Sequence, residues 1–414
     1  MKIAVIGAGV VGICTAYELA QDGHRVSIFE RNASASEEAS FACAGNLSPS
    51  LSHPLSFPSQ PATSRLRAML APTPITVTRG ATLSELGWLK QWKTAGQNFP
   101  ERFVAAQRLA AYSLERLHSL TTQAHLTHEQ ASGHMLLFQS ERTFLAFQDQ
   151  FNALKELGLV GRIFTPTEAR VLEPGLSTDG PLHSAVCYAG DEVGNCRQFA
   201  QALKDKLLEG GVQLHLGTTV SAIAQGTGIQ LHTDTQGSLD FDQVVICAGT
   251  GSAALLGPSL RHLPLNRLWS YSLSAQIKES FSAPRSAVHD CHRQVSLNRI
   301  GGRIRVSGGA ELGGTADVHN EKIIKLLYQS LQSNFPGAAH HSRSMQTWKG
   351  CSIFSPDMLP LIGPTASPGI WLNLAHGHNG WSMACGSARI LADQMRGQPT
   401  GLNATLVHPG RFKS

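Results

Sequence analysis

The N-terminal thirty residues constrain the fold of this chain more than any other segment. A short apolar run at 2–6 leads directly into a Gly-Ala-Gly-Val-Val-Gly motif at 7–12, which opens a helical stretch that ends near Gly23. A second β-type run follows at 25–29. Strand, glycine motif, helix and strand in this order predict the βαβ unit of a dinucleotide-binding domain on a parallel sheet.

The three glycines of the motif and one acidic residue have separate mechanical roles. Gly7 permits the tight turn out of the strand, Gly9 lets the backbone approach a pyrophosphate, and Gly12 allows close helix–strand packing. The pyrophosphate then lies at the positive end of the helix dipole. Glu30 follows the last glycine at the distance where a carboxylate accepts hydrogen bonds from ribose hydroxyls and repels a 2′-phosphate. A glycine-rich turn in an ordinary parallel sheet is the alternative.

Size and composition describe a globular chain of about two domains. The chain has 414 residues, of which 42% are hydrophobic and 15% charged, with 40 glycines. These values argue against disordered, fibrous and coiled-coil proteins and favour an α/β fold. The net charge of +5 is spread without a block of like charges, so we expect no nucleic-acid partner.

Cysteine usage and the N-terminus indicate a cytoplasmic protein. The eight cysteines include no C-x-x-C pair and no zinc-finger spacing, so we expect reduced thiols and no metal. The apolar start contains three glycines and Glu18 and has no cleavage pattern, unlike a signal peptide. No apolar run reaches the roughly eighteen residues of a spanning helix.

The rest of the chain alternates helical and β-type patterns. Apolar residues at spacings of three and four predict an amphipathic helix over 100–120. Further helices are expected at 195–209, 321–335 and 381–395, and strands at 134–138, 185–188, 213–216, 230–232, 244–248, 271–277, 294–297, 303–307 and 370–375. Two of these strands, 244–248 and 370–375, run into glycine-containing turns at 249–251 and 376–380. Several separated segments that return to one cofactor favour FAD over a nicotinamide.

Six motifs together make the sequence recognisable. They are the 7–12 motif with Glu30-Arg31, Ser-Phe-Ala-Cys-Ala-Gly-Asn at 40–46, Gly-Asp-Glu-Val-Gly-Asn-Cys at 190–196, Arg299 before Arg-Ile-Arg-Val at 303–306, Ser-Pro-Asp at 355–357, and Gly-His-Asn-Gly-Trp-Ser at 377–382. With them the chain resembles, over nearly its whole length, the D-amino acid dehydrogenase small-subunit family within the glycine oxidase and D-amino acid oxidase superfamily.

The resemblance implies a bipartite α/β fold. A Rossmann-like FAD-binding domain would take 1–60, 191–255 and 341–414. An inserted α+β substrate domain with an antiparallel or mixed sheet would take 61–190 and 256–340. In the family, the segment at 40–47 lines the flavin and the backbone of Val220 holds the adenine, although Val220 alone reads as a core strand residue.

The cofactor contacts expected from motif and resemblance fall into five groups. They are Gly7, Gly9, Val10, Val11 and Gly12; Glu30 and Arg31; Ser40, Ala44, Gly45, Asn46 and Leu47; Val220, Ala248 and Gly249; and Gly377, Asn379, Gly380, Trp381 and Ser382. The helix that begins near Gly380 would direct its dipole at the flavin carbonyl. Trp381 either walls the flavin ring or is a core aromatic residue.

Three residues are expected to contact the substrate. Arg299 ends a β-type run where the family places its anchoring arginine, and a guanidinium binds a carboxylate through two hydrogen bonds. Tyr271 matches a tyrosine near the substrate in relatives, with a buried core tyrosine as the alternative. His378 is expected to contact cofactor or substrate, although turn histidines are often only structural. Relatives carry a second arginine where this chain has Ser352.

The resemblance implies FAD-dependent oxidation of D-amino acids to 2-oxo acids and ammonia, with electrons passed to a quinone or another carrier. An oxidase, or an enzyme for secondary amines such as D-proline, hydroxy-D-proline or sarcosine, stays open. So does a structural subunit of a larger complex, since one site arginine is lost. A mixture of apolar, aromatic and basic residues at 65–92 predicts either peripheral contact with the inner membrane face or packing on the substrate domain.

Overall fold

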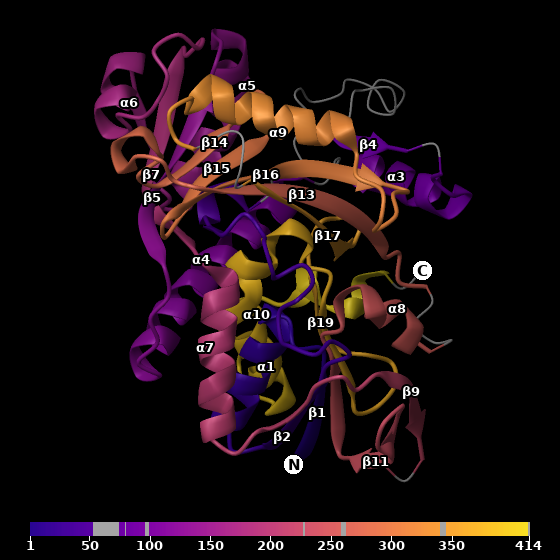
Figure 1. Ribbon diagram of the computed structural model, residues 1–414. Coiled ribbons are helices and arrows are strands. Elements are labelled where there is room, and N and C mark those ends of the chain that lie inside the picture. The colour runs from indigo at the N-terminus through magenta and orange to yellow at the C-terminus, as the bar shows by residue number, and fades with distance from the viewer. Residues whose placement is uncertain are drawn as a thin grey trace.

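The computed structural model describes residues 1–52, 74–78, 80–95, 99–226, 228–257, 262–339 and 345–412. Two layered units lie one above the other (Figure 1). The lower unit contains the N-terminus, a parallel sheet and the helices α1, α7 and α10. The upper unit is a large sheet covered by helix α9. The predicted α/β class with a Rossmann-like unit and a second mixed-sheet unit is confirmed.

The sheet of the lower unit has six strands. Its order is β18 (Leu361–Pro364), β19 (Ile370–Leu374), β12 (Gln243–Ile246), β1 (Lys2–Ile6), β2 (Arg25–Phe29) and β8 (Gln213–His215). All neighbours pair in parallel except β18 and β19. In a parallel sheet all carboxyl ends meet at one edge, which is where such sheets bind their ligands.

Both faces of the central strands β1 and β12 are buried, which explains why these strands are largely apolar. In β1, Ile3 and Val5 pack in one core with α1 (Val10–Gln21), α7 (Cys196–Glu209) and α10 (Gly380–Met395). The alternate residues Ala4 and Ile6 pack in a second core. That core includes a three-stranded sheet of β9 (Val220–Gln225), β10 (Ile229–Thr233) and β11 (Gly237–Phe241).

The upper sheet has ten strands. Its main path is β17 (Gln346–Phe354), β13 (Asn266–Gln276), β16 (Arg303–Leu312), β15 (Val295–Ile300), β14 (Ala287–Asp290), β5 (Gln130–Phe138), β7 (Ser184–Gly194) and β3 (Asn46–Leu47). Strand β4 (Ile75–Val77) pairs with β16, and β6 (Arg162–Phe164) pairs with β7. Most pairs are antiparallel, but β14 with β5 and β16 with β4 are parallel.

One face of the upper sheet is closed by a helix. Ile323, Leu327 and Leu331 of α9 (Glu321–Asn334) are buried in one core with Leu297 and Val306 of the sheet. Side chains alternate between the two faces of a strand, so the intervening residues point towards the lower unit. The remaining helices are α3 (Leu83–Ala95), α4 (Phe99–Gln123), α5 (Glu141–Glu156), α6 (Pro166–Leu172) and α8 (Ser252–Leu255).

The strand pairing can be compared with the predicted domain limits, which stay a prediction. The prediction places 1–60 and 341–414 in the cofactor domain, but strands β3 and β17 within these ranges pair in the upper sheet. The end of β7, at 191–194, does so as well. The two units therefore exchange short segments along the chain, which apolar patterns do not reveal.

The segment predicted to touch a membrane is only partly described. Leu66, Met69 and Leu70 lie outside the described residues. Trp88 of α3 is buried in a core with Ile75 of β4, whereas Leu83 is exposed. Part of the segment therefore packs on the upper sheet. Among the residues that the structure describes, no helix combines the length and the apolar character needed to cross a membrane.

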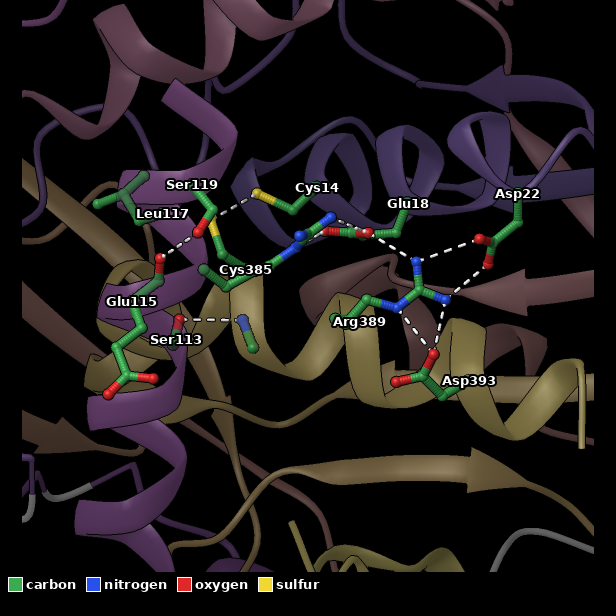
Figure 2. A network of polar contacts seen from close by, with 12 residues as sticks. Cys14, Glu18, Asp22, Ser113, Glu115, Leu117, Ser119, Cys385, Arg389 and Asp393 are labelled. Carbon is green, nitrogen blue, oxygen red and sulfur yellow. Dashed lines mark hydrogen bonds and ion pairs between the residues drawn. The ribbon is translucent and has the colours of Figure 1, made fainter. Parts of the chain in front are cut away.

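A buried ion-pair network joins α1, α4 and α10 (Figure 2). Glu18 of α1 is fully buried and accepts hydrogen bonds from Arg116 Nε and Nη2 at 2.6 and 2.8 Å. Arg389 of α10 donates to Glu18 at 2.8 Å and to Asp22 at 2.6 Å. Burial alone would raise the pKa of Asp22, but the bonds from Arg389 and Arg396 outweigh it and lower that pKa. The network fixes how the three helices pack.

We expect Glu18→Ala to destabilise the protein by about 3 kcal/mol, because it leaves the partly buried Arg116 guanidinium without its carboxylate, while Arg389 keeps Asp22 and Asp393 as partners. The thermal midpoint of the FAD-loaded protein is the measurement. Glu209→Ala is the matched control, since Glu209 forms an exposed pair with Lys206 on α7 and should change stability by no more than about 0.5 kcal/mol. Equal shifts in the two variants would contradict this reading of the network.

Candidate active site

A cavity of about 790 Å³ lies between the two units. Its lower wall consists of the turns that follow β1, β2, β12 and β19 at the carboxyl edge of the parallel sheet. Its upper wall comes from the inward face of the large sheet. The main bordering segments are 6–11, 29–32, 36–46, 218–220, 247–251, 289–296, 307–310 and 373–382.

The turn after β1 is built for close backbone approach. Gly7 has a φ of +103°, and a Cβ there would lie 2.6 Å from the carbonyl oxygen of Cys247. A Cβ on Gly12 would lie 1.9 Å from the carbonyl oxygen of Gly7. Helix α1 begins after Gly9, which offers no capping side chain, so the helix presents first-turn N–H groups at the cavity. This end of the helix suits a pyrophosphate.

Glu30 directly follows β2 at the same edge and is buried. Its Oε2 accepts the N–H of Ala8 at 2.8 Å, and its Oε1 accepts the N–H and the Nδ2 of Asn32 at 2.9 and 2.8 Å. These bonds fix the carboxylate beside the glycine turn, and Oε2 keeps a further lone pair for a ribose hydroxyl. Arg31 pairs instead with Glu38, which also borders the cavity.

The beginning of α10 leaves polar atoms without partners. His378 Nε2, Trp381 Nε1 and Ser382 Oγ are buried and have no hydrogen-bond partner among the described residues. Burial lowers the pKa of His378 to about 4, so this imidazole is neutral at physiological pH. His376 differs, because its Nε2 lies 3.0 Å from Ser387 Oγ within α10. Unsatisfied buried polar atoms at a cavity wall indicate that a ligand completes them.

The segment at 40–46 connects the lower cavity wall to the upper sheet. Ser40 Oγ accepts the N–H of Val10 at 3.1 Å. The carbonyl of Cys43 accepts Arg305 Nη1 at 3.0 Å, and that of Ala44 accepts Asn298 Nδ2 at 2.8 Å. The segment is therefore held from both sides over the cavity.

The structure brings most of the predicted cofactor residues together around this cavity. Those that border it are Gly7, Gly9, Val10, Val11, Glu30, Arg31, Ser40, Ala44, Gly45, Asn46, Val220, Ala248, Gly249, Gly377, Asn379, Gly380, Trp381 and Ser382. His378, predicted as a cofactor or substrate contact, borders it as well. Gly12 and Leu47 do not: Gly12 packs under the glycine turn and Leu47 is a core residue.

The structure places Arg299 away from the cavity, and its role as substrate anchor stays a prediction. In β15, Ser296 borders the cavity, whereas Leu297 packs towards α9 on the other face. Arg299 lies two residues after Leu297 and therefore on that outer face. Its guanidinium donates to Ser280 Oγ at 3.0 Å and to the carbonyl of Gly301 at 3.3 Å. The strand carries the right residue type with the opposite orientation.

The expected role of Tyr271 is also changed by its partners. Tyr271 borders the cavity, but its hydroxyl donates to Glu311 and accepts the N–H of Asn320 at 3.0 Å. Lys349 Nζ lies 3.0 Å from the same carboxylate and is itself buried. Burial and the bond to Glu311 raise the pKa of Tyr271. The hydroxyl thus belongs to an internal network and is not presented to a substrate carboxylate.

Sequence reasoning missed the polar residues on the upper wall. His289 and Ser296 face each other across the β14–β15 pair and both border the cavity. Ser307 of β16 lies beside Ser296 in the adjoining pair. The available indication was weak: polar residues alternate with Val and Leu in two short β-type runs. That alternation does not reveal which face meets a cofactor.

Comparison with known proteins identifies the family. Residues 2–394 match the family model described as FAD dependent oxidoreductase. The chain belongs to that family. This flavoenzyme is similar to a D-amino acid dehydrogenase of Cereibacter sphaeroides, with 33% identity over 405 residues that cover 96% of this chain and 92% of the relative. A D-amino acid dehydrogenase of Rhizobium rhizogenes (strain K84) is 30% identical and is covered over its full length.

Solved structures share the fold of the flavoenzyme. Glycine oxidase from Geobacillus kaustophilus matches with a TM-score of 0.76 and 20% identity, covering 100% of this chain and 99% of that chain. L-proline dehydrogenase from P. horikoshii matches with a TM-score of 0.77 and 17% identity, covering 99% and 97%. The predicted family and the predicted FAD cofactor are confirmed.

The residues present fit FAD. The glycine turn and the start of α1 would hold the pyrophosphate, and Glu30 the adenosine ribose. His378, Trp381 and Ser382, each with a buried polar atom that has no partner among the described residues, border the cavity at the N-terminus of α10. That end of the helix would stabilise negative charge on a bound flavin.

We expect Glu30→Ala to weaken FAD binding by about 1.5–3 kcal/mol, because it removes the ribose acceptor and the bond to Ala8. The measurement is a fluorescence titration of the FAD-free protein with FAD. Glu30→Gln is the control: it keeps the side-chain shape and one acceptor oxygen, so its loss should be smaller. FAD affinity in Glu30→Ala equal to that of the natural protein would contradict the assigned contact.

Proposed function

We propose that this flavoenzyme oxidises D-amino acids to 2-oxo acids and ammonia and passes the electrons to a quinone or another carrier. The observation that carries the proposal is the match to D-amino acid dehydrogenases at 30–33% identity over nearly the full length of both proteins. The cavity supports it, since the cofactor cradle occupies one wall and the inward face of a second sheet supplies the other.

The bound FAD would supply the redox chemistry by accepting a hydride from the substrate Cα. What the protein adds is position, exclusion of water and a suitable electrostatic environment. The N-terminus of α10 places N–H groups and the positive end of a helix dipole at the cavity. The neutral His378 adds a polar contact there without adding charge.

The substrate end of the cavity favours neutral side chains. Ser352, where relatives carry an arginine, borders the cavity together with the neutral Cys351. A small neutral residue there leaves space but no partner for a second carboxylate. We therefore infer a preference for neutral D-amino acids. The same space favours a second candidate, the oxidation of bulkier or cyclic secondary amines such as D-proline.

The electron acceptor is a separate part of the proposal. Quinones are dissolved in membranes, and α3 exposes Leu83 and Leu86 on a helix that also carries Lys90 and Lys93. An apolar edge with basic neighbours suits peripheral contact with an anionic membrane surface. The inner face of the cell membrane is the location that this reading implies.

Anaerobic reduction of the bound flavin tests the proposed function directly. We expect D-alanine, D-phenylalanine or D-proline to bleach the flavin absorbance, and D-glutamate to react at least about tenfold more slowly. L-enantiomers are the control. A flavin that no D-amino or imino acid reduces would contradict the function, and D-glutamate as the best substrate would contradict the inferred preference.

A second experiment concerns Arg299. Because the Arg299 guanidinium lies on the α9 side of the sheet, we expect Arg299→Met to change kcat/KM by no more than about threefold. If Arg299 instead formed a buried charge pair with the substrate carboxylate, its removal would lower kcat/KM by a factor of hundreds or more. Steady-state kinetics with the best D-amino acid and an artificial acceptor distinguish the two results. A large rise in KM would restore Arg299 as the substrate anchor.

A further inference from the structure

The upper wall of the cavity contains a buried histidine whose free nitrogen has no partner. His289 of β14 is 4% exposed and borders the cavity. Its Nδ1 lies 3.2 Å from Ser296 Oγ, while its Nε2 has no hydrogen-bond partner among the described residues. A buried polar atom without a partner costs free energy, so a site that retains one is expected to receive a ligand.

The backbone fixes which atom of the neighbouring amides donates. The Oδ1 of Asn298 accepts the N–H of Val288, and its Nδ2 donates to the carbonyl of Ala44. The same Nδ2 donates to Asn46 Oδ1. Asn46 therefore turns its Nδ2 towards Ser296 and donates to Ser296 Oγ at 3.2 Å. The orientation of both amides follows from two main-chain groups whose roles cannot reverse.

The contact with Ser296 favours one tautomer of His289. Ser296 Oγ accepts from Asn46, and we assign its own hydrogen to His289 Nδ1, the acceptor within reach in the described part of the chain. An imidazole that accepts at Nδ1 carries its hydrogen on Nε2. Burial lowers the pKa of His289 to about 4, and the nearby His134 lowers it further. Asp290 and Gln294 raise this pKa, but by less. At physiological pH the ring is neutral, and it borders the cavity.

Charge on this wall is otherwise compensated. Among the described residues that border the cavity, the arginines are Arg31 and Arg293. Arg31 pairs with Glu38, and Arg293 Nη1 lies 2.9 Å from Asp290 Oδ2. Neither arginine brings an uncompensated positive charge to a substrate. A contact between His289 and an acidic group on the substrate therefore displaces no existing ion pair.

We propose that His289 is a substrate-binding residue whose Nε2–H donates to the carboxylate of the bound amino or imino acid. The inference rests on the proposed function, whose substrates all carry that carboxylate. The other acceptor on such a substrate, the amine lone pair, must stay free to form the C=N bond as the hydride leaves, so a donor on it would slow the reaction. A carboxylate is the group that gains from this donor without that cost.

Binding of propionate, a carboxylate without an amine, tests the contact in the FAD-loaded protein. The dissociation constant is measured from the change in the flavin absorption spectrum. We expect His289→Phe to raise it about 10- to 100-fold, because a hydrogen bond to a charged group is lost. His289→Gln keeps an N–H donor near the Nε2 position and should stay within about fivefold of the natural protein.

Two further variants separate this contact from general damage. His134→Gln is the matched control, because His134 is buried one strand away and does not border the cavity. It should leave the propionate affinity unchanged. Ser296→Ala removes the hydroxyl that favours the Nε2–H tautomer and should weaken propionate about 3- to 10-fold, which keeps the test available if His289→Phe does not fold.

Flavin content and turnover decide the remaining outcomes. Unchanged propionate affinity in FAD-loaded His289→Phe would overturn the proposal, and if that variant also bound FAD more weakly, the donor would be assigned to the flavin. With a D-amino acid, His289→Phe should raise the apparent Kd far more than it lowers the flavin reduction rate at saturation. A His289-dependent propionate site in a protein that no D-amino acid reduces would support the contact and contradict the proposed function alone.

Discussion

The arrangement of the cofactor unit depends on the ion pairs of the buried Glu18 carboxylate. Glu18 lies on α1 and binds guanidinium groups from α4 and α10, so one carboxylate links three helices from distant parts of the chain (Figure 2). Ser113 of α4 also accepts the N–H of Gly386, where a Cβ would meet Ser113 at 2.9 Å. Close packing at this crossing lets both α1 and α10 begin at the cavity, which brings two helix N-termini to one cofactor.

A buried guanidinium also links the upper sheet to the cofactor unit, through the segment at 40–46. Arg305 is the guanidinium that holds Cys43, with a further bond to Ser274 on the neighbouring strand. Burial lowers the pKa of Arg305, and the neighbouring thiols of Cys43 and Cys196 raise it in part. The guanidinium stays charged at physiological pH. Its charge serves to position the backbone over the cavity. Because Arg305 and Asn298 both reach this segment, the cavity wall is defined by long-range contacts between the units.

Local patterns predicted the parts of the site that depend on a few consecutive residues. The glycine turn, Glu30 and the turn before α10 each follow directly from a buried strand, so position in the chain determines position in space. Arg299 could not be placed this way, because a shift of one residue moves a strand side chain to the opposite face. The partners of Tyr271 could not be predicted for another reason: Glu311 and Asn320 are 40 and 49 residues away, and sequence spacing does not show that they satisfy its hydroxyl.

The contrast between Arg299 and His289 bears on how a chain that has Ser352, where the family resemblance implies a second arginine, can still recognise an anion. An unpaired guanidinium on the inward face would have to be desolvated beside Arg305, and two like charges in a buried site destabilise each other. A neutral imidazole avoids that cost, and its orientation is set by a chain of amides that ends on the backbone of Val288 and Ala44. Such a donor binds a carboxylate less strongly than an arginine does, but it leaves the charge balance of the cavity unchanged when no substrate is bound.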